Sequence, residues 1–304
     1  MNKKKEMKNE NNRRIETKAS GTADIMCLAR AISYKDKRDC YSGPDAIAYI
    51  LVPPFFKLLI KSRLLIRPFI GLFYPKGMYE YIIARTKYID AVFIQALKQG
   101  FDQVVIFGAG LDSRALRFQK LNQITRIFEL DAPITQQEKL KNYQAKKLRP
   151  PNNLKFVPID FNKESLAEKI KQFGFISGLK ALFIMEGVTM YLSAEAVDRT
   201  FNFISEVAGT GSLIVFDYIH GMVIQGENRY LGEEDAAKRV AKLGEAWTFG
   251  LESKEVESFL DKYNIKLQDH SRTQDLESRY FKNLKGVQVG KINGTHAIVT
   301  GIKN

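Results

Sequence analysis

Short apolar runs alternate with longer segments of mixed polarity between residues 103 and 218, and this alternation is the strongest constraint on the fold. Runs that are apolar throughout, such as VVIF, ALFIM and SLIVF, indicate strands that are buried on both faces. Because segments with helical spacing separate the runs, we expect crossover connections and a mainly parallel sheet. The predicted strands are 103–107, 126–130, 154–160, 179–186 and 211–218, and the predicted helices between them are 134–147, 163–172 and 194–207.

The end of the chain indicates a different kind of pairing. We predict a helix over 252–263 and strands over 265–270 and 295–300. No helix is evident between these two strands, in SRTQDLESRYFKNLKGVQVGKING, so antiparallel pairing is expected. A dinucleotide-binding domain would continue with parallel units instead. With no repeat and no linker between two cores, the sequence predicts one doubly wound α/β domain over residues 20–304.

Residues 20–84 precede this sheet and predict a helical cap over the active site. Residues 23–33 have helical spacing with Thr22 as a candidate N-cap, and a long helix is expected over 77–99. Prolines at 53, 54, 68 and 75 are expected to divide the intervening part into short helices. Its cations stand among Leu and Ile, which also suits a helix lying on a membrane surface, so membrane contact stays open beside a purely structural cap.

The net charge of +13 lies partly in the first 19 residues, which hold seven Lys or Arg against three Glu. This tail has almost no apolar residues, so we expect it to be disordered, as a solubilising segment or as an arm for nucleic acid. No secretory signal follows Met1, and no apolar run reaches the roughly 18 residues of a spanning helix. Cys27 and Cys40 form no CxxC pair and no zinc spacing, so a cytoplasmic protein without a metal is expected.

The stretch VVIFGAGLDSRALRF (104–118) indicates a nucleotide-binding turn after the first strand. Gly108 and Gly110 let a ligand approach the backbone, and the following helix would offer free N–H groups. A dinucleotide fingerprint requires a third glycine where this chain has Ser113, so no pyrophosphate is expected on the turn. A tight turn without a ligand is the alternative.

Acidic residues follow the next strand, at the sheet edge where ligands bind in open parallel sheets. Asp131 lies 21 residues beyond Gly110, which is the distance typical of a carboxylate that binds ribose. Glu129 has the same side-chain direction and is the second candidate. Capping of the helix that begins near Ile134 is the alternative role for Asp131.

The third and fourth predicted strands also end in carboxylates. Asp160 and Phe161 suit an adenine, with the carboxylate on the amine and the ring on the base, although Asp160 could instead cap the next helix. Glu186 ends an otherwise apolar strand, so its charge must face a cavity or a partner. Such a rim suits a cationic or hydroxyl-rich ligand.

Together these residues resemble the class I S-adenosylmethionine-dependent methyltransferases, and most closely the bacterial branch of the leucine carboxyl methyltransferase family, whose substrates are mostly unassigned. The similarity rests on SGTADIMCLARA (20–31), ARTKYID (84–90), VVIFGAGLDSRALRF, FELDAP (128–133), PIDF (158–161), FIMEGVTMYL (183–192), FDY (216–218) and GEAWTFGL (244–251). It implies a Rossmann-like methyltransferase fold, with a seven-stranded sheet whose last strand is antiparallel. It also implies S-adenosyl-L-methionine as the cofactor.

The resemblance further implies roles by position. Arg85 would bind the carboxylate of the methionine moiety through two parallel hydrogen bonds, unless it is an ordinary helix-surface arginine. Arg114 and Arg117 are expected in structural ion pairs. The other implied contacts are Gly108 beside the methionine portion and Gly110 in the same turn, Asp131 on the ribose, Asp160 with Phe161 on the adenine, and Glu186 near the methionine amine.

A sulfonium methyl group is already activated, so the protein mainly aligns the acceptor and excludes water. We expect O-methylation of a small carboxylate or hydroxyl compound, attracted by the cations of the cap if it is anionic. A hydroxyl would need a general base, for which His220 and Tyr191 are candidates, and no catalytic residue is assigned. The side chains expected to form an aromatic acceptor pocket are Tyr41, Phe55, Phe56, Trp247 and Phe249.

Several other functions remain alternatives. The eukaryotic branch methylates a protein C-terminal carboxylate, and some members of a fold bind a cofactor without activity. A nicotinamide-dependent oxidoreductase is disfavoured by Ser113 and by the antiparallel end of the sheet. A nucleic-acid amino-methyltransferase would carry an Asn/Asp-Pro-Pro-aromatic sequence where MEGVT stands, so no nucleic-acid partner is expected.

Overall fold

The computed structural model describes residues 20–161, 164–242 and 246–304, and in these residues seven strands form one sheet in the order β3-β2-β1-β4-β5-β7-β6. The predicted tail, residues 1–19, lies outside the described residues. The strands are β1 (Gln103–Phe107), β2 (Arg126–Asp131), β3 (Leu154–Pro158), β4 (Ala181–Met185), β5 (Leu213–Ile219), β6 (Ile265–Ser271) and β7 (His296–Lys303).

The sheet is parallel except at β7. Strands β1 to β5 pair in parallel, whereas β7 runs antiparallel between β5 and β6. This confirms the predicted mainly parallel sheet with an antiparallel last strand. The strand order reverses between β1 and β4, and such a reversal opens a crevice beyond the carboxyl ends of the strands.

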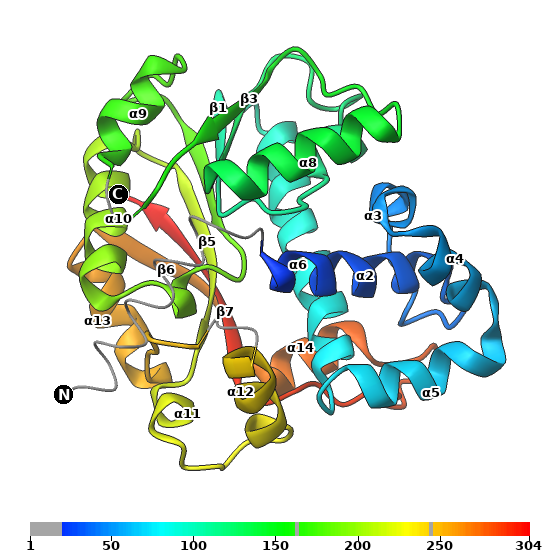
Figure 1. The fold of residues 1–304 in the computed structure, drawn as a ribbon. Helices are drawn as coiled ribbons and strands as arrows, with labels where there is room; N and C mark the ends of the chain where they lie inside the picture. The colour runs from blue at the N-terminus through cyan, green and yellow to red at the C-terminus, as the bar shows by residue number, and fades with distance from the viewer. Residues whose placement is uncertain (1–19, 162–163, 243–245) are drawn as a thin grey trace.

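Helices cover both faces of the sheet (Figure 1). One face packs on α9 (Leu166–Gln172), α10 (Ala194–Val207) and α13 (Val256–Asp261), and the other on α2 (Gly21–Lys35), α6 (Met78–Lys98), α8 (Pro133–Ala145) and α14 (Thr273–Tyr280). Because side chains alternate along a strand, neighbouring residues of β1 enter different cores: Ile106 packs with α6, and Phe107 packs with the α10 side. The apolar runs of the sequence are therefore buried on both faces, as predicted.

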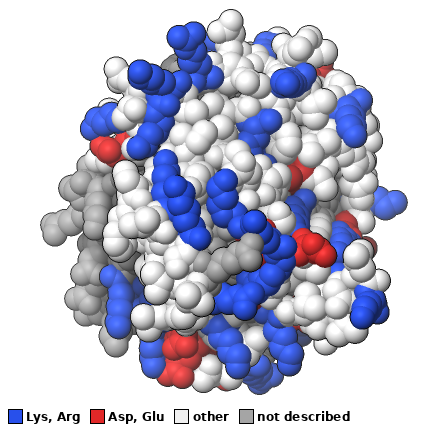
Figure 2. All heavy atoms as spheres, turned by 90° about the vertical axis from the view of Figure 1, so that its right-hand side faces the viewer, with Lys and Arg blue, Asp and Glu red and all other residues white. Residues whose placement is uncertain are grey.

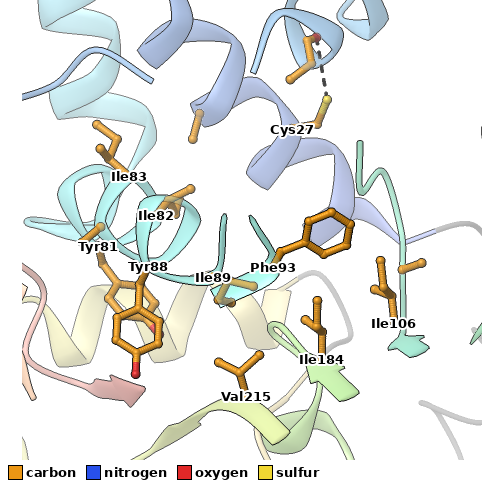
Figure 3. Close-up of a cluster of buried hydrophobic side chains, with 14 of the residues drawn as sticks. Cys27, Tyr81, Ile82, Ile83, Tyr88, Ile89, Phe93, Ile106, Ile184 and Val215 are labelled. Atoms are coloured by element: carbon orange, nitrogen blue, oxygen red, sulfur yellow. Dashed lines mark hydrogen bonds between the residues drawn. The ribbon is translucent and has the colours of Figure 1, made fainter. Parts of the chain in front are cut away.

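Helix α6 is the main helix behind the site. Its side chains Ile89 and Phe93 pack against Ile106, Ile184 and Val215 of three neighbouring strands (Figure 3). Cys27 of α2 lies in the same cluster and donates a long hydrogen bond to the Ala48 carbonyl. This packing fixes α6, and with it Arg85, against the middle of the sheet.

The cap segment forms four helices before the sheet: α2, α3 (Ala46–Leu51), α4 (Pro54–Lys61) and α5 (Arg63–Phe73). Two predictions here were wrong in detail. The N-cap of α2 is Ser20 rather than Thr22, because the Ser20 hydroxyl accepts from the Ala23 N–H. Pro68 lies inside α5 and does not end it, while Pro53 and Pro54 do separate α3 from α4.

The region between β6 and β7 contains a helix that the sequence pattern did not reveal. Helix α14 begins after Arg272, whose backbone N–H donates to the carboxylate of Asp275 at 3.0 Å. Its composition is mostly polar, and only Leu276 is fully buried, so apolar spacing gave no signal. The remaining short helices are α7 (Arg114–Arg117), α11 (Gly221–Gln225) and α12 (Glu233–Lys242).

Candidate functional site

A cavity of about 690 Å³ lies along the carboxyl edge of β1 to β4. Its wall is built by the loops after these strands, by the start of α2, by α6 and α12, and by the first residue of β7. This volume is within the range of small-molecule sites. All seven residues predicted to bind the cofactor line it: Arg85, Gly108, Gly110, Asp131, Asp160, Phe161 and Glu186.

The turn after β1 can be built only with glycine. Gly108 and Gly110 have φ angles of +56° and +48°, which side chains rarely adopt. A Cβ at Gly108 would lie 2.7 Å from Cγ2 of Val188, and one at Gly110 would lie 3.1 Å from Cβ of Ala23. The two glycines therefore let the loop after β4 and helix α2 approach the turn closely.

Asp131 holds this turn in place from the end of β2. One of its carboxylate oxygens accepts from the Gly110 N–H, and the other accepts from the Ala132 N–H at 2.7 Å. Burial raises its pKa, and the two N–H groups oppose the rise. The capping alternative is wrong, because the N-cap of α8 is Ala132 and no side chain caps that helix.

Glu129 does not face the cavity, so its candidacy as the ribose ligand is wrong. Its side chain is buried and lies 2.5 Å from Nζ of Lys139 on α8. Burial raises its pKa to about 7, although the charge of Lys139 opposes this. Glu129 and Asp131 are two residues apart, so their side chains lie on the same side of β2. The inner of the two carboxylates, Glu129, pairs with a lysine of the covering helix α8 instead of reaching the cavity.

Asp160 and Phe161 lie on the part of the wall that follows β3. The Asp160 N–H donates to Glu164 at 2.8 Å, and the Phe161 ring lies 6.3 Å from the ring of Phe107, between centroids. Ser165, not Asp160, caps α9, so the capping alternative for Asp160 is wrong as well.

Glu186 and Arg85 belong to one buried ion network at the reversal of strand order. The Arg85 Nη1 donates to Asp217 at 2.6 Å, and its Nε lies 3.1 Å from Glu186. The other Glu186 oxygen pairs with Arg114 at 2.8 Å. Arg85 is thus a buried residue and not a helix-surface arginine.

The charges of this network stabilise one another. Burial would raise the pKa of Glu186, but Arg114, Arg85 and the nearby Arg30 hold it at about 2. Burial would lower the pKa of Arg85, but Asp217 and Glu186 raise it above its ordinary value. Glu186 and Arg85 are therefore both charged near neutral pH.

Arg114 and Arg117 make the structural ion pairs that were predicted. Arg114 pairs with Asp90 at 2.9 Å, with Asp112, and with Glu186. Arg117 donates to Asp90 through both terminal nitrogens, at 2.6 and 2.8 Å. The charged LDSR stretch therefore ties the glycine turn to α6.

The leucine carboxyl methyltransferase family matches residues 72–205 of this chain. YktD of Bacillus subtilis, named as a candidate S-adenosyl-L-methionine-dependent methyltransferase, is 30% identical over 203 residues, which are 67% of this chain and 66% of YktD. The chain belongs to this methyltransferase family. The cofactor is accordingly S-adenosyl-L-methionine.

Solved structures agree on the fold. A DUF574 family protein from Streptomyces avermitilis superposes with a TM-score of 0.57 at 13% identity, covering 96% of this chain and all of that one. A candidate methyltransferase from Thermobifida fusca gives 0.57 at 15% identity, covering 91% of this chain and 94% of that one. At such identities the likeness concerns the architecture alone.

The cavity of this methyltransferase-family chain has the donor set that the cofactor needs. Carboxylates of Asp131, Asp160 and Glu186 stand at three successive strand ends, where hydroxyls and an ammonium group can pair with them. Arg30 and Arg85 add cations for a carboxylate. That these side chains contact the cofactor stays a prediction, since Asp131, Glu186 and Arg85 also hold protein groups.

One cavity residue was missed from the sequence because only the carboxyl ends of strands were searched. His296 is the first residue of β7, and since β7 is antiparallel, its first residue lies beside Ile219 at the end of β5. The ring stacks on Tyr81 at 4.5 Å and meets the edge of Trp247. His220, the earlier candidate, stacks on Tyr230 and does not line the cavity, whereas Tyr191 does.

The aromatic wall also differs from the prediction. Trp247 lines the cavity, but Tyr41, Phe55, Phe56 and Phe249 do not. Tyr41 is buried against Tyr79 and Phe281, and Phe55 points to solvent. The rings that take their place are Phe73, Tyr74, Tyr81 and Tyr191.

Proposed function

We propose that this protein transfers the methyl group of S-adenosyl-L-methionine to an oxygen atom of a small organic acceptor. The observation that carries the proposal is a cavity in which a glycine turn, three strand-end carboxylates and a group of aromatic side chains meet. The glycine turn and carboxylates suit the polar cofactor. The aromatic side suits an apolar acceptor, because ligand pockets combine apolar walls with a few polar groups.

The bound cofactor supplies a methyl group already activated by its positive sulfur. The residues of the chain then need to orient the acceptor and keep water away. Tyr81, Tyr191 and Trp247 form the wall on which an acceptor ring or chain would pack. Arg239 lies at the same wall and offers a cation for an anionic acceptor, while it also binds the carbonyls of Leu72 and Phe73.

The hydrogen bonds around His296 favour a hydroxyl acceptor over a carboxylate. Asn293 Oδ1 accepts from the N–H and from the hydroxyl of Thr295, so the Thr295 oxygen must itself accept from Nδ1–H of His296, at 2.6 Å. The proton is then on Nδ1, and Nε2 carries a lone pair. No partner for Nε2 appears among the described residues.

Nε2 of His296 is therefore the proposed acceptor of the proton that a substrate hydroxyl releases. The bound cofactor would supply the methyl group, and as the acceptor oxygen is methylated, its hydroxyl proton would pass to Nε2 of His296. Burial, together with the charge of Arg85, lowers the pKa of His296 well below its ordinary value, so the ring is neutral and Nε2 keeps its lone pair.

Cofactor binding is tested with Asp131→Asn. Wild-type protein should be stabilised by about 2.7 kcal/mol at a hundredfold excess of S-adenosyl-L-methionine over its dissociation constant, and this stabilisation should be lost in the variant. Thermal unfolding with and without the cofactor measures both. Glu129→Gln is the matched variant outside the cavity and should keep the response. If the cofactor stabilised wild type and Asp131→Asn equally, Asp131 would not bind the cofactor.

The acceptor class is tested with His296→Gln. Turnover of phenolic or alcoholic acceptors should fall by about 100-fold or more, because a general base contributes that much, while cofactor affinity by calorimetry stays within a few-fold. Carboxylate acceptors, which carry no proton, should be affected far less. His220→Gln is the control. An enzyme that turns over only carboxylates, with no loss in His296→Gln, would favour the methyl-ester alternative.

A further inference from the structure

The α4–α5 hairpin exposes large apolar side chains on the face that turns away from the protein. Its inner side chains, among them Ile60, Phe56 and Phe69, pack on the core next to α2. Its outer side chains include Leu64, which is 87% exposed, and Leu72, which is 79% exposed. The hairpin provides five of the twelve large apolar side chains that are exposed in the described residues: Phe55, Leu58, Leu64, Leu65 and Leu72.

The hairpin and the residues that flank it are strongly cationic. Residues 46–79 contain five Lys or Arg and no Asp or Glu. Lys61 and Arg67 are exposed, and no ion pair of the described residues includes either of them. Figure 2 looks onto the side of the molecule that carries α3, α4 and α5, where Lys and Arg are spread over a mostly uncharged surface and outnumber Asp and Glu.

We propose that this hairpin docks on the surface of an anionic lipid bilayer. Exposed Leu and Phe would enter the boundary between headgroups and acyl chains, and Lys and Arg would pair with lipid phosphates. Charge complementarity favours this partner over a second copy of the chain, because a second copy would bring the same uncompensated cations against the face. No described helix has the length and apolar character to cross a membrane, so the contact is with its surface.

The hairpin also reaches the cavity. Phe73 at the end of α5, with Tyr74 and Pro75 after it, lines the cavity wall. Arg239 of α12 donates to the carbonyls of Phe73 and Leu72, at 2.6 and 3.1 Å. Docking would therefore place the cavity beside the bilayer.

Vesicle sedimentation tests the proposal with the full chain. Wild-type protein should bind vesicles of equal parts phosphatidylglycerol and phosphatidylcholine. Its affinity for vesicles of phosphatidylcholine alone should be at least about tenfold lower. Phe55→Ser/Leu64→Ser should weaken binding to the anionic vesicles by about tenfold or more. Because this pair leaves all charges unchanged, it separates the hairpin from the basic residues 1–19. Lys61→Glu/Arg67→Glu should weaken the same binding to a similar extent.

Matched changes elsewhere serve as controls. Leu284→Ser/Val287→Ser alters two other exposed apolar residues, and Lys254→Glu/Lys262→Glu reverses two other exposed cations; both should bind vesicles like wild type. Retained binding of S-adenosyl-L-methionine shows that each variant is folded. Equal vesicle binding by the Phe55/Leu64 variant and wild type overturns the proposal. The proposal is also overturned if wild type does not bind the vesicles and instead forms a dimer in sedimentation equilibrium that the Phe55/Leu64 variant does not form.

Discussion

The carboxylates that line the cavity also bind other groups of the protein. Glu186 bridges Arg85 of α6 and Arg114 of α7, and Asp131 bridges two backbone N–H groups. Breaking a buried ion pair leaves an uncompensated charge and is strongly destabilising. These carboxylates therefore contribute to stability before any ligand is bound.

Glu186→Gln tests this directly. We expect a loss of about 3–5 kcal/mol in the free energy of unfolding at pH 7, because Arg85 and Arg114 lose a shared anion. The folded-state pKa of Glu186, about 2, lies below its ordinary value of 4.5, so its stabilisation is present above pH 4.5 and disappears as the pH falls towards 2. Urea unfolding across this range should show the difference between wild type and variant narrowing.

The exposed pair of Glu138 and Lys141 provides the comparison. Glu138→Gln should change the unfolding free energy by less than about 1 kcal/mol, since surface pairs contribute little. A difference for Glu186→Gln that stays constant down to pH 2.5 would contradict the role given to its charge.

The sequence predicted which site residues reach the cavity where these residues follow the end of a parallel strand. It did not do so where the place of a side chain depends on a neighbouring helix or strand. Asp131, Asp160 and Glu186 reach the cavity because parallel strands share one carboxyl edge. The pairing of Glu129 with Lys139 depends on how α8 lies over the sheet, which spacing along the chain does not give. His296 reaches the site only because β7 is antiparallel.

At the scale of elements, the glycine turn links β1 to α2 and to the loop after β4. Strands β1, β4 and β5 were predictable because they are buried on both faces and thus apolar throughout. Helix α14 was not, because one buried side chain leaves no periodic pattern. Pro68 lies inside α5 although it has no N–H to donate to the carbonyl of Leu64, so a proline in the sequence does not by itself mark a helix end.

Gly108→Ala tests whether the turn after β1 requires glycine. The positive φ and the contact with Val188 should together destabilise the fold by about 1–3 kcal/mol and abolish cofactor binding, as measured by urea unfolding and calorimetry. Gly71→Ala is the control, because Gly71 lies in α5 with no atom within 4 Å of the added Cβ. That change should stabilise the protein by up to about 1 kcal/mol. If Gly108→Ala changed neither the free energy of unfolding nor cofactor affinity, the turn would be able to shift without cost.

At the scale of the whole molecule, the cavity joins parts of the chain that are far apart in sequence. Thr22, Ala23 and Met26 of α2 line it together with Ala236 and Arg239 of α12. A ligand held between the two helices stabilises both, because only the assembled state binds it. Two segments separated by about two hundred residues should thus respond together.

Hydrogen exchange measures this response. Saturating S-adenosyl-L-methionine should slow amide exchange in both α2 and α12, while α13, on the opposite face of the sheet, keeps its rate. NAD⁺ at the same concentration should leave all three unchanged. Protection confined to the loops after β1 and β2 would place the ligand away from the two helices.

The position of β7 has a consequence for synthesis. The latest of the seven strands to leave the ribosome occupies an interior place, between β5 and β6. Until residues 296–303 emerge, β5 has a bare backbone edge and β6 has no neighbour at all, and bare edges recruit foreign strands. The sheet of the nascent polypeptide therefore cannot close before this strand emerges, and until then its bare edges are the sites that a chaperone would have to cover.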